Sequence, residues 1–125
     1  MIFDTDIFIW IQRGNTKAAD LVDRCEDRYL SIQTYLELLQ GAKNKQQHLV
    51  IQDFIKSYDF LVLPLSENIG HRSLIYIEEY ALSSGLRAGD AIIAATAIEN
   101  NMILATSNNK HFKSIRELKL HVLKP

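Results

Sequence analysis

Short apolar runs alternate along the chain with longer stretches of helical periodicity, and this alternation restricts the fold more than any other feature. The runs rich in β-forming residues are Met1–Phe3, Tyr29–Ile32, Phe60–Leu63, Met102–Ala105 and Leu120–Leu123. Helical spacing is found in Thr16–Arg24, Gln46–Tyr58, Asn68–Ser83 and Asp90–Glu99. Strands that alternate with helices form a parallel sheet covered by helices on both faces. We therefore predict an α/β fold.

The composition is that of one ordinary globular domain. The chain has 125 residues, a net charge of −1 and 47% hydrophobic residues, and no linker or repeat divides it, so we expect one domain over residues 1–125. Its single cysteine, Cys25, cannot form an internal disulfide, which favours a reducing compartment. The N-terminus lacks a basic signal-peptide region, and no apolar run approaches the ~18 residues of a membrane span. We expect a cytoplasmic protein without membrane contact.

Basic residues are concentrated in the tail. A nearly neutral chain binds nucleic acid only through a local patch. The last sixteen residues contain one acid, Glu117, against Lys110, His111, Lys113, Arg116, Lys119, His121 and Lys124. This tail is either a local nucleic-acid contact or a solvated surface, and the sequence leaves both interpretations open.

Acidic and amide residues follow several of the predicted strands. Asp4 comes directly after the first strand, Glu37 lies in the helix after the second, and Asp90 begins the apolar helix "DAIIAATAIE". Asn108 comes shortly after the fourth strand. In a right-handed parallel sheet all these positions face the same edge, beyond the carboxyl ends of the strands, where ligands bind. We therefore predict one site at this edge.

Each of these residues also has a purely structural interpretation. Thr34 and Glu37 fit a capping box, and Asp90 suits the positive end of a helix dipole. Either Asp4 or Asp6 could cap a helix over Ile7–Ile11, and Asn108 could hold a turn.

Electrostatics limits how such acids can coexist. Two carboxylates about 5 Å apart repel by roughly 3 kcal/mol at an effective dielectric constant near 20. Three such pairs would compete with the roughly 5–15 kcal/mol that stabilises a whole domain. The acids must therefore bind protons or a hard cation such as Mg²⁺ or Mn²⁺. The four histidines lack zinc-ligand spacing, and we predict that each is exposed or partly buried.

Four features together carry a family resemblance. These are "DTDIFIW" at the start, "TYLELLQG" after the second strand, the late segment "GLRAGDAIIAATAIENNMILATSNNKHF" and the length of 125 residues. In this order the chain resembles the PIN-domain ribonucleases, and among them the toxins of VapBC toxin–antitoxin systems. The resemblance implies a three-layer α/β/α domain with a five-stranded parallel sheet. It also implies a Mg²⁺- or Mn²⁺-dependent endoribonuclease that hydrolyses structured RNA, either tRNA or rRNA.

The resemblance assigns roles to single residues. Asp4, Glu37 and Asp90 match the family's first three acids and would hold the metal. Asn108 falls on the fourth acidic position, where an amide can still ligate a metal or orient a water but supplies no charge. Asp6 is an auxiliary contact.

Further residues are expected to assist these acids. Thr5 and Thr106 would hydrogen-bond the acids or the bound phosphate. The candidate contacts to RNA phosphates are Arg13, Arg87, Lys110 and Lys113.

The same resemblance implies partners. These are a VapB-type antitoxin and a second copy of the chain in a homodimer. Phe8 and Trp10 are candidates for either contact, but packing in the core is the favoured interpretation of both.

Two other functions fit parts of the sequence. "DTD" after a first strand also resembles haloacid-dehalogenase-like phosphatases, but Phe8 stands where that family has Thr or Val. The second alternative is a catalytically inactive PIN-like module that binds RNA or protein, which the uncharged Asn108 favours.

Overall fold

The computed structural model describes all 125 residues as an α/β fold around a parallel sheet. Its five strands run in the order β3-β2-β1-β4-β5, and every neighbouring pair is parallel. The strands are β1 (Ile2–Phe3), β2 (Tyr29–Ser31), β3 (Leu61–Leu63), β4 (Leu104–Thr106) and β5 (Leu120–Val122). Ile2 pairs with both Tyr29 and Leu104, so β1 is the central strand. The predicted five-stranded parallel sheet is confirmed.

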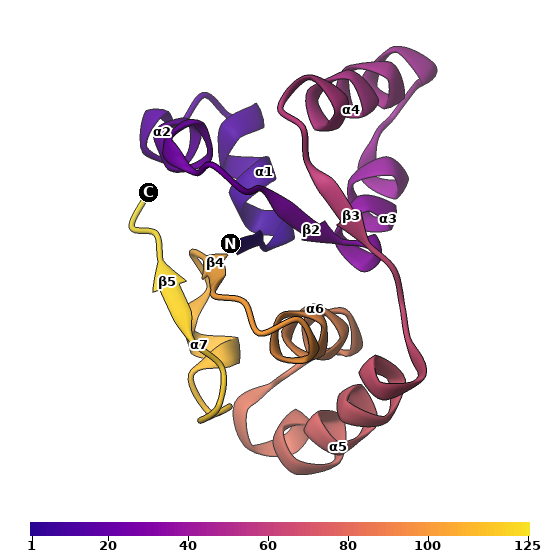
Figure 1. Cartoon of the computed structure of the whole chain (residues 1–125), viewed down its shortest axis with the longest axis vertical. Coiled ribbons are helices and arrows are strands. Elements are labelled where there is room, and N and C mark those ends of the chain that lie inside the picture. Colours follow the sequence, from indigo (N-terminus) through magenta and orange to yellow (C-terminus); the bar gives the residue numbers. More distant parts are fainter.

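Helices cover both faces of the sheet. They are α1 (Thr5–Gln12), α2 (Thr16–Arg24), α3 (Ile32–Gly41), α4 (Lys45–Ser57), α5 (Glu67–Ser84), α6 (Ala88–Glu99) and α7 (Asn109–Phe112). Figure 1 shows α1 to α4 on one side of the strands and α5 to α7 on the other. Successive residues of one strand supply the two layers, because side chains alternate across a sheet. Phe3 packs with α1, α2 and α4, and Ile2 packs with α5 and α6.

The helix α6 lies deepest. Six of its residues, Ala91 and Ile93–Ala97, are buried, as expected for a helix that is small and apolar on nearly all sides. Neighbouring α5 ends at Gly85, which takes the left-handed conformation (φ 71°) that favours glycine. No helix combines the length and apolarity that a bilayer span needs.

Several boundaries differ from prediction for local reasons. Ser31 caps α3 by accepting a hydrogen bond from the Thr34 N–H at 3.0 Å, so β2 ends before Ile32. The predicted Thr34–Glu37 capping box is therefore wrong, since Thr34 is inside the helix. A turn with Asn101 at φ 55° closes α6, and β4 begins only at Leu104. The short helix α7 was not predicted.

Candidate active site

Asp4 stands where β1 ends and α1 begins. Its carboxylate is 5% exposed and accepts two hydrogen bonds, at 2.8 Å from the Thr5 N–H and at 2.7 Å from the Thr106 hydroxyl. The strand thus delivers the acid to the sheet edge, and the neighbouring strand β4 supplies Thr106 to hold it. Asp4 also occupies the N-cap position of α1, one of the structural roles considered for it.

Asp6 lies in the first turn of α1 and is held by Ser107, the residue that follows β4. Its Oδ2 accepts hydrogen bonds from the Ser107 N–H at 2.9 Å and from the Ser107 hydroxyl. The indole N–H of Trp10 donates to the same Ser107 oxygen at 3.0 Å. The second carboxylate oxygen, Oδ1, is buried without any partner. An orphaned, buried carboxylate oxygen is costly and calls for a donor or a cation.

Glu37 reaches the same edge from α3. Its Oε1 accepts a hydrogen bond from the Thr5 hydroxyl at 3.0 Å. The start of α6 lies very close, since a Cβ added to Gly89 would be 3.2 Å from Gln33 Nε2 and 3.5 Å from Glu37 Oε2. Glycine at this position therefore lets α6 bring Asp90 near Glu37.

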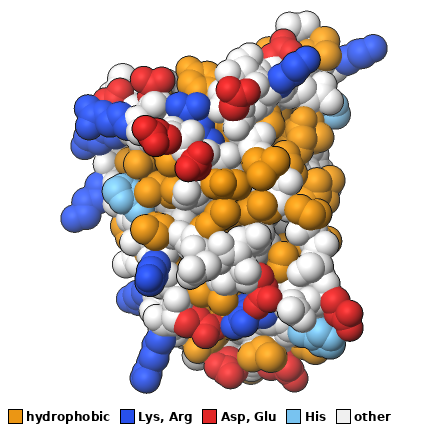
Figure 2. All heavy atoms as spheres, viewed as in Figure 1, with side chains coloured by type: hydrophobic (Ala, Val, Ile, Leu, Met, Phe, Trp, Pro, Cys, Tyr) orange, Lys and Arg blue, Asp and Glu red, His pale blue; other side chains and the backbone are white.

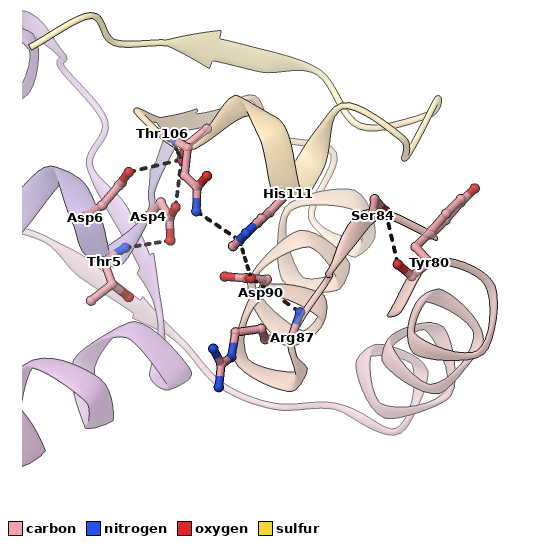
Figure 3. Close-up of polar contacts among 10 residues, drawn as sticks. Asp4, Thr5, Asp6, Tyr80, Ser84, Arg87, Asp90, Thr106 and His111 are labelled. Carbon is pink, nitrogen blue, oxygen red and sulfur yellow. Dashed lines mark hydrogen bonds and ion pairs between the residues drawn. The ribbon is translucent and has the colours of Figure 1, made fainter. Parts of the chain in front are cut away.

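Asp90 belongs to the first turn of α6 and faces the segment after β4. Its Oδ2 lies 3.4 Å from the Arg87 N–H and 3.1 Å from Nδ1 of His111. The side-chain amide nitrogen of Asn108 is 3.0 Å from the same Nδ1, and the Asn108 N–H donates to the Thr106 hydroxyl. Figure 3 shows Asp90, His111 and Asp4 converging from three separate segments. The structural role of Asp90 near a helix start is thus present beside its place in this cluster.

Two of the acids, Asp4 and Glu37, have raised pKa values. Burial holds the pKa of Asp4 well above its usual range, and the charges of Asp6 and Asp90 add to this, against the hydrogen bond from Thr106. Burial likewise raises the pKa of Glu37, with a further contribution from the charge of Asp90. The cluster has no lysine or arginine ion pair; its one ion-pairing contact joins Asp90 to His111. The edge is therefore an uncompensated acidic site.

The sequence model of the PIN domain matches residues 1–118. The chain belongs to the PIN-domain family. It is 33% identical to "Ribonuclease VapC" of Rickettsia bellii over 129 aligned positions, which cover 96% of this chain and 93% of the relative. In fold it is similar to a chain of a toxin–antitoxin complex from Klebsiella pneumoniae, with a TM-score of 0.79, 30% identity and coverage of 94% and 93%. A chain of VapBC-1 from nontypeable Haemophilus influenzae has a TM-score of 0.78, 25% identity and 98% coverage of both chains.

The donor set of this PIN domain suits a hard divalent cation. Asp4, Glu37 and Asp90 offer only oxygen ligands, and the orphaned Oδ1 of Asp6 lacks a positive partner. No three such side chains are already arranged around one ion-sized position. Thr5 and His111 hold two of the acids in other directions. The acids therefore have to turn toward an ion, and binding it would relieve their repulsion.

Sequence reasoning missed two members of the cluster. His111 is partly buried, as predicted, but it contacts Asp90 instead of standing alone in a basic tail. Its spacing of three from Asn108 across a helical turn was the available signal. Ser107 joins Asp6 to Trp10, and nothing in the sequence marked it.

The remaining candidates lie at different distances from the acids. The exposed Arg87 immediately precedes α6, and Lys110 and Lys113 flank His111. Arg13 lies past the far end of α1 and stacks on Trp10, with 5.7 Å from the guanidinium carbon to the ring centre. Phe8 is 3% exposed and belongs to the core, where it also lines a cavity with Val50 and Phe54 of α4.

Proposed function

We propose that this PIN domain is a Mg²⁺- or Mn²⁺-dependent endoribonuclease toxin of a type II toxin–antitoxin system. The observation that carries the proposal is the convergence of Asp4, Glu37 and Asp90 at one edge of the sheet without a lysine or arginine to balance them. A group of acids with raised pKa values in such a crevice is typical of a functional site. The 33% identity to a protein named "Ribonuclease VapC" supports RNA as the substrate.

The acids would hold the metal, and the neighbouring side chains would position them. When bound, Mg²⁺ or Mn²⁺ would supply Lewis-acid chemistry: it would polarise a phosphodiester oxygen and lower the pKa of the attacking water. Thr106 orients the carboxylate of Asp4, and Thr5 orients that of Glu37. The amide of Asn108 contacts His111, which in turn contacts Asp90, and from this place it would orient a water. Hydrolysis of this kind leaves a 5′-phosphate and a 3′-hydroxyl and does not use the RNA 2′-hydroxyl as nucleophile.

We expect the RNA to be a structured molecule, tRNA or rRNA, cut at an exposed single-stranded loop. Cationic side chains near the edge would bind its phosphates and leave sequence selection to other contacts. Of the four predicted phosphate contacts, Arg87 is exposed and lies beside Asp90, whereas Arg13 lies past the far end of α1.

The proposed partner is a VapB-type antitoxin. Two adjoining cavities of about 310 and 180 Å³ form a groove between α1, α3 and α4 and share Leu38, Val50 and Ile51. The larger cavity reaches Glu37, so the apolar groove ends at the acidic edge. Figure 2 displays hydrophobic side chains on this side of the surface. A partner segment with apolar side chains would fill the groove. A cationic side chain that follows them would compete with the metal for the acids.

A homodimer is part of the same proposal. Its support is the helix α5, on which the three apolar side chains Leu74, Ile75 and Leu82 are 59%, 50% and 103% exposed. Large exposed apolar groups gathered on one helix are typical of protein interfaces.

Induced expression in a bacterial host tests the nuclease proposal. The chain and its Asp90→Asn variant are expressed with and without the neighbouring reading frame, and new 5′-phosphate RNA ends are mapped. We expect growth arrest with discrete new ends, abolished by Asp90→Asn and relieved by the neighbour. A folded wild-type protein that produces neither arrest nor new ends would instead favour the non-cutting binding module.

A further inference from the structure

A polar cavity of about 490 Å³ opens beside His111. Its wall is formed by Ser83, Ser84, Gly85, Lys110, His111, Lys113 and Ser114. These residues come from two places, the end of α5 and the segment that contains α7. No hydrophobic residue and no acid lines the cavity. Small-molecule sites are mostly apolar, so this lining suits a charged and hydrated ligand.

Two uncompensated cations define the charge of the cavity. Lys110 and Lys113 are exposed, and neither takes part in any ion pair of the chain. Figure 2 also shows basic side chains along the edge of the molecule near β5 and α7. A lysine ammonium acts as a point charge that binds phosphate. The charge of the cavity therefore suits an anion.

His111 connects this cavity to the acidic edge. It lines the cavity, and its Nδ1 is 3.1 Å from Asp90 Oδ2. Figure 3 shows His111 between Asp90 and the end of α5 that carries Ser84. A ligand in the cavity would thus lie directly beside the acids that we propose to act on a phosphodiester.

The opposite wall presents hydrogen-bond acceptors. The hydroxyl of Ser84 donates to the Tyr80 carbonyl at 3.1 Å, which leaves its oxygen lone pairs free. A ribonucleotide combines phosphate oxygens, which accept, with a 2′-hydroxyl, which donates. Lysines on one wall and a serine acceptor on the other match this pair of groups.

We propose, resting on the nuclease function above, that this cavity is a ribonucleotide subsite next to the cleavage point. Lys110 and Lys113 bind a phosphate that flanks the cleaved one, and Ser84 accepts a hydrogen bond from a ribose 2′-hydroxyl. The subsite would hold the strand in place and favour RNA over DNA.

The lysine part is tested by binding without metal. A Lys110→Ala/Lys113→Ala variant is compared with a Lys17→Ala/Lys56→Ala control, which removes two exposed lysines elsewhere. The probe is fluorescein-labelled oligouridylate in EDTA, with anisotropy followed over a range of salt concentrations. We expect roughly tenfold weaker binding for the first variant and a salt slope reduced by about 0.7 for each phosphate that the protein no longer neutralises. Wild-type affinity and slope would overturn the assignment.

The ribose part is tested with Ser84→Ala, which alanine's high helix propensity makes compatible with α5. We expect weaker binding of oligouridylate by several-fold and no change for oligodeoxyuridylate. An equal loss for both probes, or no loss for either, would overturn the role of Ser84.

Cleavage is measured separately, by mapping new 5′-phosphate ends in total cellular RNA incubated with the protein and Mn²⁺, so that the two proposals fail independently. Weaker binding by the lysine variant with no cleavage by the wild-type protein would support the subsite and contradict the nuclease. Cleavage by the wild-type protein with unaltered binding by the lysine variant would do the reverse.

Discussion

Two groups of charged side chains in this fold differ in whether a cation lies beside their acids. In the first, Arg72 of α5 contacts Glu99 at 2.6 Å and Glu117 at 3.1 Å, and the Tyr76 hydroxyl donates to Glu117. In the second, the acids at the sheet edge have hydroxyls, N–H groups and one histidine as partners. The first group ties α5 and α6 to the segment before β5.

The pKa values reflect this difference. Hydrogen bonds to Tyr76 and Glu99 raise the pKa of Arg72, which keeps its charge in place. Burial, together with a hydrogen bond to Glu117, raises the pKa of Tyr76 to about 12. At the acidic edge the raised pKa belongs to the carboxyls themselves, so their charged forms are disfavoured there. Acids that stabilise this fold have a cation beside them, and acids available to a ligand do not.

Asp4→Asn is expected to have the largest effect. We predict that it lowers RNA cleavage by more than about 100-fold, beyond the 10- to 100-fold typical of residues that only orient a metal ligand. An asparagine can keep both hydrogen bonds, to the Thr5 N–H and the Thr106 oxygen, while the charge is lost. The same change should raise the metal-free Tm by several degrees, because it removes a buried charge.

Cleavage assays and thermal unfolding on the same preparation measure both effects. Asp20→Asn, on the exposed surface of α2, is the matched control and should leave both unchanged. Retained cleavage in Asp4→Asn would remove Asp4 from the site.

A divalent metal should stabilise the protein by binding the acids at the sheet edge and no acids elsewhere. A ligand at a hundredfold excess over its Kd adds about 2.7 kcal/mol to the free energy of unfolding. We predict that Mn²⁺ produces a gain of this order in the wild-type chain and in Glu117→Gln, and almost none in Asp90→Asn. Thermal unfolding across a Mn²⁺ titration measures it, and an equal gain in Asp90→Asn would separate that acid from the metal.

The stability of the metal-free protein should fall as pH rises, because the acids at the sheet edge are buried without a cation beside them. The pKa values of Asp4 and Glu37 are raised on folding, so above the ordinary pKa near 4 the folded chain holds more protons than the unfolded chain. Their contribution to the free energy of unfolding therefore falls as pH rises through the raised pKa values, by at most about 1.4 kcal/mol per pH unit for each proton.

Urea unfolding without metal, at several pH values between about 4 and 8, measures this dependence. The difference between wild type and Asp4→Asn isolates Asp4, since all other groups are shared. A difference that shrinks as pH rises would contradict the raised pKa.

Sequence patterns were sufficient for the fold and for the edge of the sheet at which the predicted acids lie, because both follow from strand order. Asp4 had to reach the carboxyl edge once β1 was a central parallel strand, and the start of α6 had to bring Asp90 there. The hydrogen bonds that the acids make depend on side chains far away in the sequence. Thr106 and Asp4, for example, are more than a hundred residues apart, and no local sequence pattern predicts their hydrogen bond.

The capping prediction failed for a related reason. Ser31 and Thr34 are both good N-cap residues, and only the end of β2 decides which one caps α3. The same limit hid His111, whose ring approaches Asp90 only because a short helix forms after β4. The apolar face of Trp10 also suggested a docking surface, while its indole N–H is used inside the chain on Ser107.

Glu99→Gln is expected to have the smallest effect on stability. Its sign should be opposite to that of Asp4→Asn. Glu99 shares Arg72 with Glu117, and the side chains of Arg72 and Glu99 are 32% and 20% exposed, so solvent screens part of their attraction. We predict that the free energy of unfolding falls by about 1 kcal/mol, because a partly buried arginine loses one charged partner. RNA cleavage should stay within about twofold of wild type, since such a loss leaves the native state dominant. Urea unfolding measures the change, and Glu78→Gln, which removes an exposed acid of α5, is the matched control. We therefore expect that removing an acid destabilises the protein at the Arg72 group and stabilises it at the sheet edge. A gain in stability from Glu99→Gln would contradict this, because it would mean that Arg72 does not offset the cost of burying Glu99.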